Sequence, residues 1–311
     1  MKNIYRQVKR LISFAILILF FYLISTFFQT ETFLTSLKKI GEHPLFISLG
    51  LMFYFISFLL KGIAWKWYVG KGFSLSTAMI GIWYSLLVNH LLPIKVGDLF
   101  RSYVFYKREK HLDFSLCLQS VVIMRLFDIF SLIIIVSLGL FLVPLYFQFS
   151  MLPLVMMISG GIVLAFIIIT KFPDFFHKQY SFFQQTFFQW KTIPVFFLIF
   201  ISWLMEAAVL MTVVSALGSS IHVVTAIWVN SITIIGQTFQ MTPGGIANYE
   251  TIMSLAMKTV DFPVEFGMIT ALISHGLKFL FSFFIGFIAW MIYPITFGEV
   301  GKWQKERRNE A

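Results

Sequence analysis

The chain has little charge and almost no cysteine. Only 12% of its 311 residues are Asp, Glu, Lys or Arg, about half the share of a typical soluble domain, whereas 59% are hydrophobic. Residues 129–170 contain no Asp, Glu, Lys, Arg or His, which leaves room for two bilayer crossings of roughly 20 residues each. Cys117 has no partner cysteine, which excludes an internal disulfide framework. These absences predict an integral membrane protein.

Motifs for metal binding, nucleotide binding and nucleophilic catalysis are also missing. No pair of histidines has metal-ligand spacing, and the chain has no nucleotide-binding loop and no HExxH motif. We therefore expect no metal and no cofactor. Enzymatic activity is left open but is not favoured.

The net charge of +10 is concentrated at the two ends of the chain. Lys and Arg occupy positions 2, 6, 9 and 10 before the first apolar run and positions 302, 305, 307 and 308 after the last. This is the pattern of cytoplasmic flanks and not of a nucleic-acid-binding face. It predicts a multi-pass protein of the plasma (inner) membrane with both termini in the cytoplasm. The first apolar run lacks a signal-peptide cleavage site, so we expect it to be retained as a helix.

Hydropathy predicts an all-α polytopic fold in a single membrane domain, residues 1–311. We expect about six full crossings, at 11–29, 45–61, 126–147, 152–170, 192–214 and 266–293. Two further apolar segments, 75–92 and 223–241, each end at a turn containing proline and are followed by a less apolar helical stretch.

The positive-inside rule favours a re-entrant path for these two segments. A full crossing at 75–92 would place Lys107, Arg108 and Lys110 outside, against the rule. If 75–92 enters the membrane and 96–108 returns, all three stay inside, together with Lys61. The same path for 223–258 leaves the loop at 218–222 outside, where there is no Lys or Arg. Irregular backbone at membrane depth is tolerated only inside protein or beside a wet cavity.

The two re-entrant regions also resemble each other. With a shift of 150 positions, Pro93 aligns with Pro243, Arg125 with His275 and Asp128 with Lys278. Repeat one covers about 73–144 and repeat two about 223–294. Because three crossings separate them, the second copy is inverted, which is an architecture of transporters.

Charges within the first repeat form two groups. Lys95, Asp98 and Arg101 are spaced by three, so a helix would present them on one face, with Asp98 able to pair with either cation. The alternative is a helix that starts in interfacial water. Arg125 and Asp128 have the same spacing inside an apolar run. The alternative for this pair is simple self-neutralisation.

Charges in the second half of the chain form three further groups. In TPGGIANYE, Gly244 and Gly245 permit a tight turn, and the helix that follows, which contains Glu250, offers N–H groups to an anion. An ordinary turn is the alternative. Glu206 lies in the middle of a crossing without a local partner. Two alternatives are open for it: a protonated carboxyl, or an ion pair with Lys278 of another helix. His275 and Lys278 share a helix face.

A buried charge persists in the membrane only with a partner or in a watery site. We therefore expect these residues to surround a polar cavity with excess positive charge, suited to an anionic lipid head group. The predicted cavity residues are Lys95, Asp98, Arg101, Arg125, Asp128, Glu206, Gly244, Gly245, Glu250, His275 and Lys278.

The chain resembles the transmembrane, flippase-like domain of lysylphosphatidylglycerol synthases. The matching stretches are KGIAWKWYV, LPIKVGDLFRSYVFYKR, RLFDIFSLIII, WLMEAAVLMTVVSALG, TPGGIANYE and HGLKFLFSFFIGFIAWMIYP, in this order. Two positions depart from the usual pattern, where Ile94 replaces a glycine and Met124 an acidic residue. The resemblance implies a lipid-translocating membrane domain without the soluble aminoacyl-transferase domain, so lipid aminoacylation by this chain is not expected.

The expected function is translocation of an anionic or polyprenyl-linked lipid, either passive or coupled to an ion. One alternative is an integral membrane transferase acting on a lipid carrier, with Asp98, Asp128 or Glu250 as base. Another is a non-catalytic partner of a neighbouring synthase. The sequence leaves open whether the chain forms a homo-oligomer.

Overall fold

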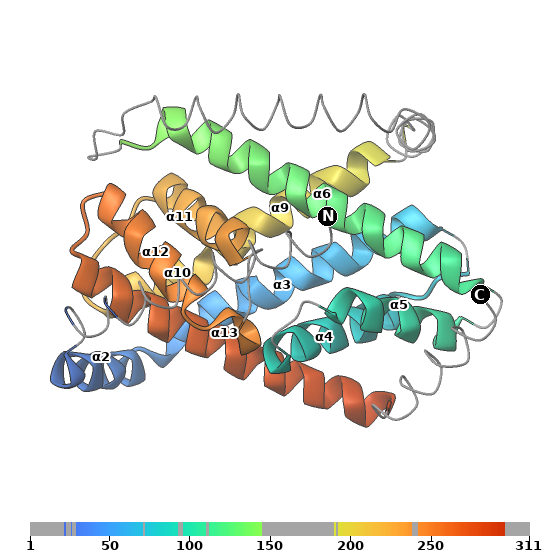
Figure 1. Cartoon of the computed structure of the whole chain (residues 1–311), viewed down its shortest axis with the longest axis horizontal. Coiled ribbons are helices and arrows are strands. Elements are labelled where there is room, and N and C mark those ends of the chain that lie inside the picture. The colour runs from blue at the N-terminus through green and yellow to red at the C-terminus, as the bar shows by residue number, and fades with distance from the viewer. Residues whose placement is uncertain are drawn as a thin grey trace, which may run out of the picture.

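The structure is a bundle of α-helices (Figure 1). The computed structural model describes residues 22, 26, 29–70, 72–92, 96–109, 112–144, 190, 192–237 and 242–295. All regular elements within these residues are helical, which confirms the predicted all-α polytopic membrane fold. The predicted crossing at 152–170, and all but a few positions of that at 11–29, lie outside the described residues.

Four helical segments of the described part are long and apolar enough to cross a membrane. They are α3 (Pro44–Val69), α6 (Phe114–Leu142), α9 (Thr192–Glu206) continued by α10 (Ala208–Ala216), and α13 (Val264–Ile292). At 29 residues each, α6 and α13 are about 44 Å long, more than the ~30 Å hydrocarbon core requires.

Two of these helices are longer than hydropathy predicted. Helix α3 continues past Lys61 to Val69, and α6 begins twelve residues before the predicted start at 126. The hydropathy prediction set both boundaries at charged residues, Lys61 and Arg125. In the structure both cations are neutralised by carboxylates, so the helices continue through them.

The two re-entrant segments form short helical hairpins. In the first hairpin α4 (Leu75–Leu91) lies antiparallel to α5 (Gly97–Arg108): the Arg108 side chain bonds to Thr77 at the base, and Gly97 N–H donates to Asn89 near the tip. In the second, α11 (Val223–Gly236) packs on α12 (Asn248–Thr259), and the short 3₁₀ turn η2 (Pro243–Gly245) precedes α12. These helices measure about 18 to 26 Å, too short to span the core.

The helix bounds follow the offset of the predicted repeat. Helices α3, α4, α5 and α6 start at 44, 75, 97 and 114, whereas α9, α11, α12 and α13 start at 192, 223, 248 and 264. The correspondence therefore extends before residue 73 and includes α3 and α9–α10. These two elements run antiparallel, since Gly50 meets Thr212 and Lys61 meets Trp203, as an inverted pair requires.

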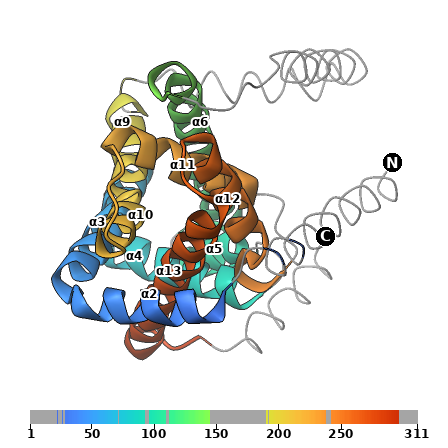
Figure 2. The same cartoon turned by 90° about the vertical axis from the view of Figure 1, so that its left-hand side faces the viewer.

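The long helix of each repeat packs on the first hairpin helix of the other. Helix α13 packs on α4, and α6 packs on α11. Figure 1 shows α6 and α13 on opposite sides of the central helices, and in Figure 2 helix α2 (Thr30–Glu42) lies across one end of the bundle. A long helix therefore covers each hairpin, and polar groups of the hairpins can lie inside the bundle.

The re-entrant path predicts opposite labelling of two loops. In a Cys117→Ser background, which removes the buried native thiol, Ser220→Cys should react with a membrane-impermeant maleimide added to intact cells. Lys107→Cys, an exposed position at the base of the first hairpin, should react only after permeabilisation. Labelling of position 107 from outside intact cells would contradict the hairpin path.

Candidate functional site

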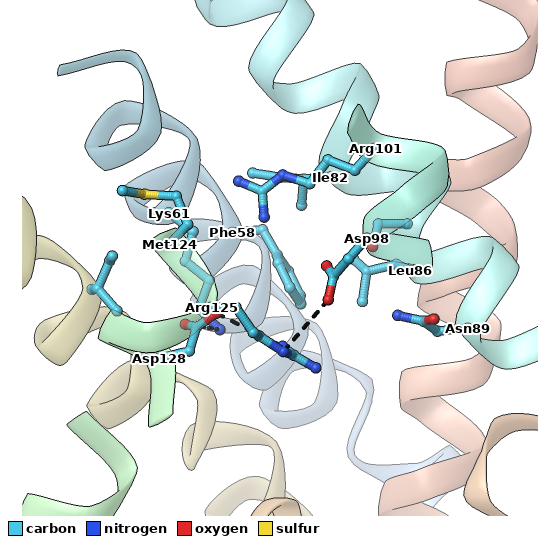
Figure 3. Close-up of a pocket in the computed structure, with 12 residues that line it drawn as sticks. Phe58, Lys61, Ile82, Leu86, Asn89, Asp98, Arg101, Met124, Arg125 and Asp128 are labelled. Carbon is cyan, nitrogen blue, oxygen red and sulfur yellow. Dashed lines mark ion pairs between the residues drawn. The ribbon is translucent and has the colours of Figure 1, made fainter. Parts of the chain in front are cut away.

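A polar cavity lies between the first hairpin and helices α3, α6 and α9. Its volume of about 80 Å³ gives room for several water molecules. Three cationic and two carboxylate side chains line it, in a bundle that is otherwise mostly apolar (Figure 3). The lining residues are Phe58, Lys61, Ile82, Ser85, Leu86, Asn89, Asp98, Arg101, Met124, Arg125, Asp128 and Ile199.

Arg125 lies between two carboxylates at the wall of this cavity. Its Nε is 3.5 Å from Asp98 Oδ2, and its Nη1 is 3.7 Å from Asp128 Oδ2, as the dashed lines in Figure 3 mark. The predicted pair of Arg125 and Asp128 on one helix face is confirmed. Asp128 in turn lies 3.9 Å from Lys61 Nζ, which connects α6 to α3.

The chain of ion pairs continues from Lys61 into the second repeat. Lys61 Nζ is 3.6 Å from Glu206 Oε2, and Glu206 Oε1 is 3.2 Å from Lys278 Nζ. Lys278 also donates to Asn230 Oδ1 at 3.0 Å. The predicted pairing of Glu206 with Lys278 across helices is confirmed, and Glu206 has a second cation that the sequence did not suggest.

The ion-pair chain runs from an accessible end to a buried one. The exposed fraction of the side chain falls from 41% for Arg125 and 32% for Asp98 to 4% for both Glu206 and Lys278. Charges alternate in sign along it, so each buried charge has a partner, as a low-dielectric interior requires. Trp203 supports its middle: the indole N–H donates to Asp128 Oδ1 at 2.9 Å, and Lys61 Nζ lies 3.4 Å from the ring centroid.

Arg101 is the exception to this pairing. Its guanidinium lies 3.8 Å from the ring centroid of Trp65, and the residue is only 8% exposed. Within the described residues it has no ion-pair partner, and its Nε has no hydrogen-bond acceptor. The carboxylate of Asp98, which the sequence offered to Arg101 or Lys95, makes its ion pair with Arg125 of α6, and no direct ion pair joins it to Arg101 in the described residues. Lys95 lies outside the described residues.

The second hairpin carries a separate polar cluster. Gly244 and Gly245 have φ angles of 66° and 79°, which only glycine adopts readily, so the predicted tight turn is confirmed. His275 Nδ1 is 2.7 Å from Glu250 Oε1, and the N–H of Ala247 donates to Glu250 Oε2 at 2.8 Å. The start of α12, which we expected to be open to an anion, therefore already carries a carboxylate of the chain itself. None of these residues lines the cavity described above.

Sequence reasoning missed three polar side chains that complete the site. Lys61 was placed in the cytoplasm by the positive-inside rule, but its side chain is only 12% exposed and lies between two acids. The amide oxygen of Asn89 accepts from the N–H of Gly97, and that of Asn230 accepts from Lys278 Nζ. The only signal for Lys61 was its place at the start of KGIAWKWYV, a stretch that carries the family resemblance. His90 packs on Phe279 with 4.5 Å between ring centroids.

The site offers no cluster for a metal. Within the described residues, no three His, Cys, Asp or Glu side chains gather closely enough to hold a metal ion.

Comparison with known proteins finds similarity to membrane proteins. The family model described as the lysylphosphatidylglycerol synthase TM region matches residues 10–286. The chain is also similar to a UPF0104 membrane protein of Methanocaldococcus jannaschii, with 20% identity over 290 residues, covering 81% of this chain and 86% of the relative. No solved structure matches the chain significantly.

Proposed function

The chain belongs to the lysylphosphatidylglycerol synthase TM region family, and from this premise we propose that it translocates a phosphate-bearing lipid across the bilayer. In this proposal the head group enters the polar cavity while the acyl or prenyl chains stay in the membrane. The observation that carries it is the guanidinium of Arg101, a buried cation at the cavity without a carboxylate partner in the described residues.

The charges at the cavity leave one cation uncompensated. Asp98 and Asp128 both pair with Arg125, and Asp128 also with Lys61, so neither makes a direct ion pair with Arg101 in the described residues. Burying an unpaired charge is expensive, which favours an anion from outside the chain in this place. A guanidinium is well matched to the oxygens of a phosphate.

The location of Arg101 suits a head group that passes through the protein. The residue lies on α5, the returning helix of the first hairpin, and its side chain lines the cavity together with Asp98 and Asn89 (Figure 3). The aromatic face of Trp65 fixes the guanidinium from the opposite side. A bound phosphate would displace water from a site that is already preorganised.

The same geometry weighs against a membrane transferase. The carboxylates considered as a catalytic base are all engaged: Asp98 with Arg125, Asp128 with Arg125 and Trp203, and Glu250 with His275. A carboxylate held by a cation or an N–H donor is a weak base for substrate protons. The structure therefore favours transport over transfer chemistry.

Purified protein in lipid vesicles tests this proposal. Labelled phosphatidylglycerol in the inner leaflet should become accessible to an external quencher faster than in protein-free vesicles, and faster than a labelled neutral glycolipid without phosphate. Arg101→Gln should slow this movement about tenfold to a hundredfold, the equivalent of one charge-assisted hydrogen bond. Arg108→Gln, at the base of the same hairpin, is the matched control and should have little effect.

The stability of the Arg101 variant separates transport from a structural role. Because Arg101 has no ion-pair partner in the described residues, its neutralisation strands no carboxylate. Arg101→Gln loses the contact with the ring of Trp65 and should lower the free energy of unfolding by no more than about 2 kcal/mol. Loss of stability in step with loss of lipid movement, or equal movement of the neutral glycolipid, would contradict the proposal.

A further inference from the structure

Three side chains surround His275 at the second hairpin, two through hydrogen bonds and one through ring stacking. His275 Nδ1 lies 2.7 Å from Glu250 Oε1, and His275 Nε2 lies 3.3 Å from Gln237 Nε2. The ring of Tyr249 stacks on the imidazole with centroids 4.2 Å apart and an interplanar angle of 18°. His275 and Glu250 are 2% and 3% exposed, so the imidazole has protein groups at both nitrogens and on one face.

The hydrogen bonds define two protonation states of this network. In the first, Nδ1–H of the neutral imidazole donates to Glu250, and Nε2 accepts from the amide N–H of Gln237. In the second, a proton taken from water sits on Nε2, and the imidazolium is balanced by the Glu250 carboxylate. Nε2–H then needs an acceptor, which Gln237 supplies when its amide rotates to present Oε1.

Rotation of the Gln237 amide would change a contact with the turn between α11 and α12. In the present arrangement the same amide nitrogen lies 3.4 Å from the carbonyl oxygen of Gly244, in the Pro-Gly-Gly turn. When the amide rotates, this nitrogen leaves the carbonyl. Phe279, one turn after His275, also contacts the turn, because a side chain at Gly244 would overlap its ring. The proton on His275 and the position of the turn are therefore linked through one amide.

The surrounding charges make this pair a better proton site than Glu206. Glu206 lies between Lys278 and Lys61, and two cations hold a carboxylate in its charged form. Lys278 is satisfied by Glu206, which leaves Glu250 as the carboxylate that faces the imidazole. The titratable groups facing His275 are Glu250 and Tyr249 on α12, His90 on α4, and Lys278 on α13, with Glu206 of α9 and Tyr54 of α3 behind Lys278.

The geometry points to the Glu250–His275 pair as the proton-binding site that couples lipid translocation to a proton gradient. Gln237, which contacts both His275 and Gly244, links the protonation of His275 to the position of the Pro-Gly-Gly turn. The inference rests on the proposed function and names its coupling ion. The proton enters from water on one side, resides on His275 Nε2 while the turn is in one position, and is released to the other side when the turn moves.

The coupling is tested in vesicles with and without an imposed pH gradient. One proton per lipid would drive labelled phosphatidylglycerol toward one leaflet, to a limit of about tenfold per pH unit. Glu250→Gln keeps an acceptor for the N–H of Ala247 but cannot balance the charge of an imidazolium, and its leaflet ratio should stay near one whatever its rate. Glu265→Gln and His222→Gln, outside the network, should respond to the gradient like the wild type.

Nitrogen NMR of histidine-labelled protein in detergent measures the protonation state of His275 independently of lipid transport. The His275 signal, identified by its loss in His275→Gln, should change from the neutral to the imidazolium pattern as the sample is acidified. In Gln237→Met the titration should persist while the response to the gradient is lost, since the link to Gly244 is removed.

Four outcomes would overturn the inference. A gradient response that survives in both Glu250→Gln and His275→Gln, or a His275 signal that does not change with pH, would exclude this pair as the site. Lipid movement that is fast but indifferent to the gradient in the wild type would refute the coupling alone. Absence of lipid movement in all vesicles would refute the proposed function and the coupling with it.

Discussion

Glu206→Gln is expected to be one of the two most destabilising substitutions predicted for this protein. The carboxylate lies between Lys278 at 3.2 Å and Lys61 at 3.6 Å, and its side chain is 4% exposed. Removing one member of a buried pair leaves an uncompensated charge, at a cost of roughly 3–5 kcal/mol. The measurement is the free energy of unfolding in mixed detergent micelles, with Glu265→Gln as the control acid, which makes no ion pair in the described residues.

A double-mutant comparison shows whether the ion pair is responsible. Lys278→Met in the Glu206→Gln background removes the more deeply buried of the two stranded cations, while Lys61 keeps Asp128 at 3.9 Å. The double variant should therefore be more stable than Glu206→Gln alone, although lipid movement should not recover to the same degree. Strict additivity of the two single effects would mean that the contact between Glu206 and Lys278 contributes nothing.

The sequence predicted the helices well because their patterns are local. The first hairpin was expected at 75–92 and 96–108 and is found at Leu75–Leu91 and Gly97–Arg108. Apolar composition and the turns that interrupt it are sufficient for such bounds. The same local rule was wrong where a charge lies inside a helix, since hydropathy does not show whether Lys61 meets a lipid, water or a carboxylate.

The residues of the site and their pairing were predicted only in part. Spacing along one helix correctly placed Arg125 beside Asp128, because residues three apart are neighbours on any α-helix. The partner of Asp98 and the second partner of Glu206 come from helices far away in sequence, and their approach depends on how the two repeats pack. Glu206, a charge without a local partner, predicted a distant cation, and Lys278 was correctly named, but Lys61 was not.

The turn of the second hairpin is the other place where a single change should have a large effect. Gly244 has φ 66°, a conformation that costs other residues about 1–2 kcal/mol, and a side chain there would overlap the ring of Phe279. Overpacking adds about 1–3 kcal/mol, so Gly244→Ala should lower the free energy of unfolding by about 2–5 kcal/mol. Unfolding in mixed micelles measures this effect.

Two further variants separate the two causes. Gly218 has φ 85° but open space around it, so Gly218→Ala should show the conformational cost alone. Phe279→Ala in the Gly244→Ala background removes the overlap and should recover the packing part, while the conformational part remains. If Gly244→Ala costs no more than Gly218→Ala, the turn has room to move away from Phe279. The close contact with Phe279 of α13 would then not restrict the Pro-Gly-Gly turn. The contacts of Gln237 with Gly244 and His275 would remain as the link between the turn and His275.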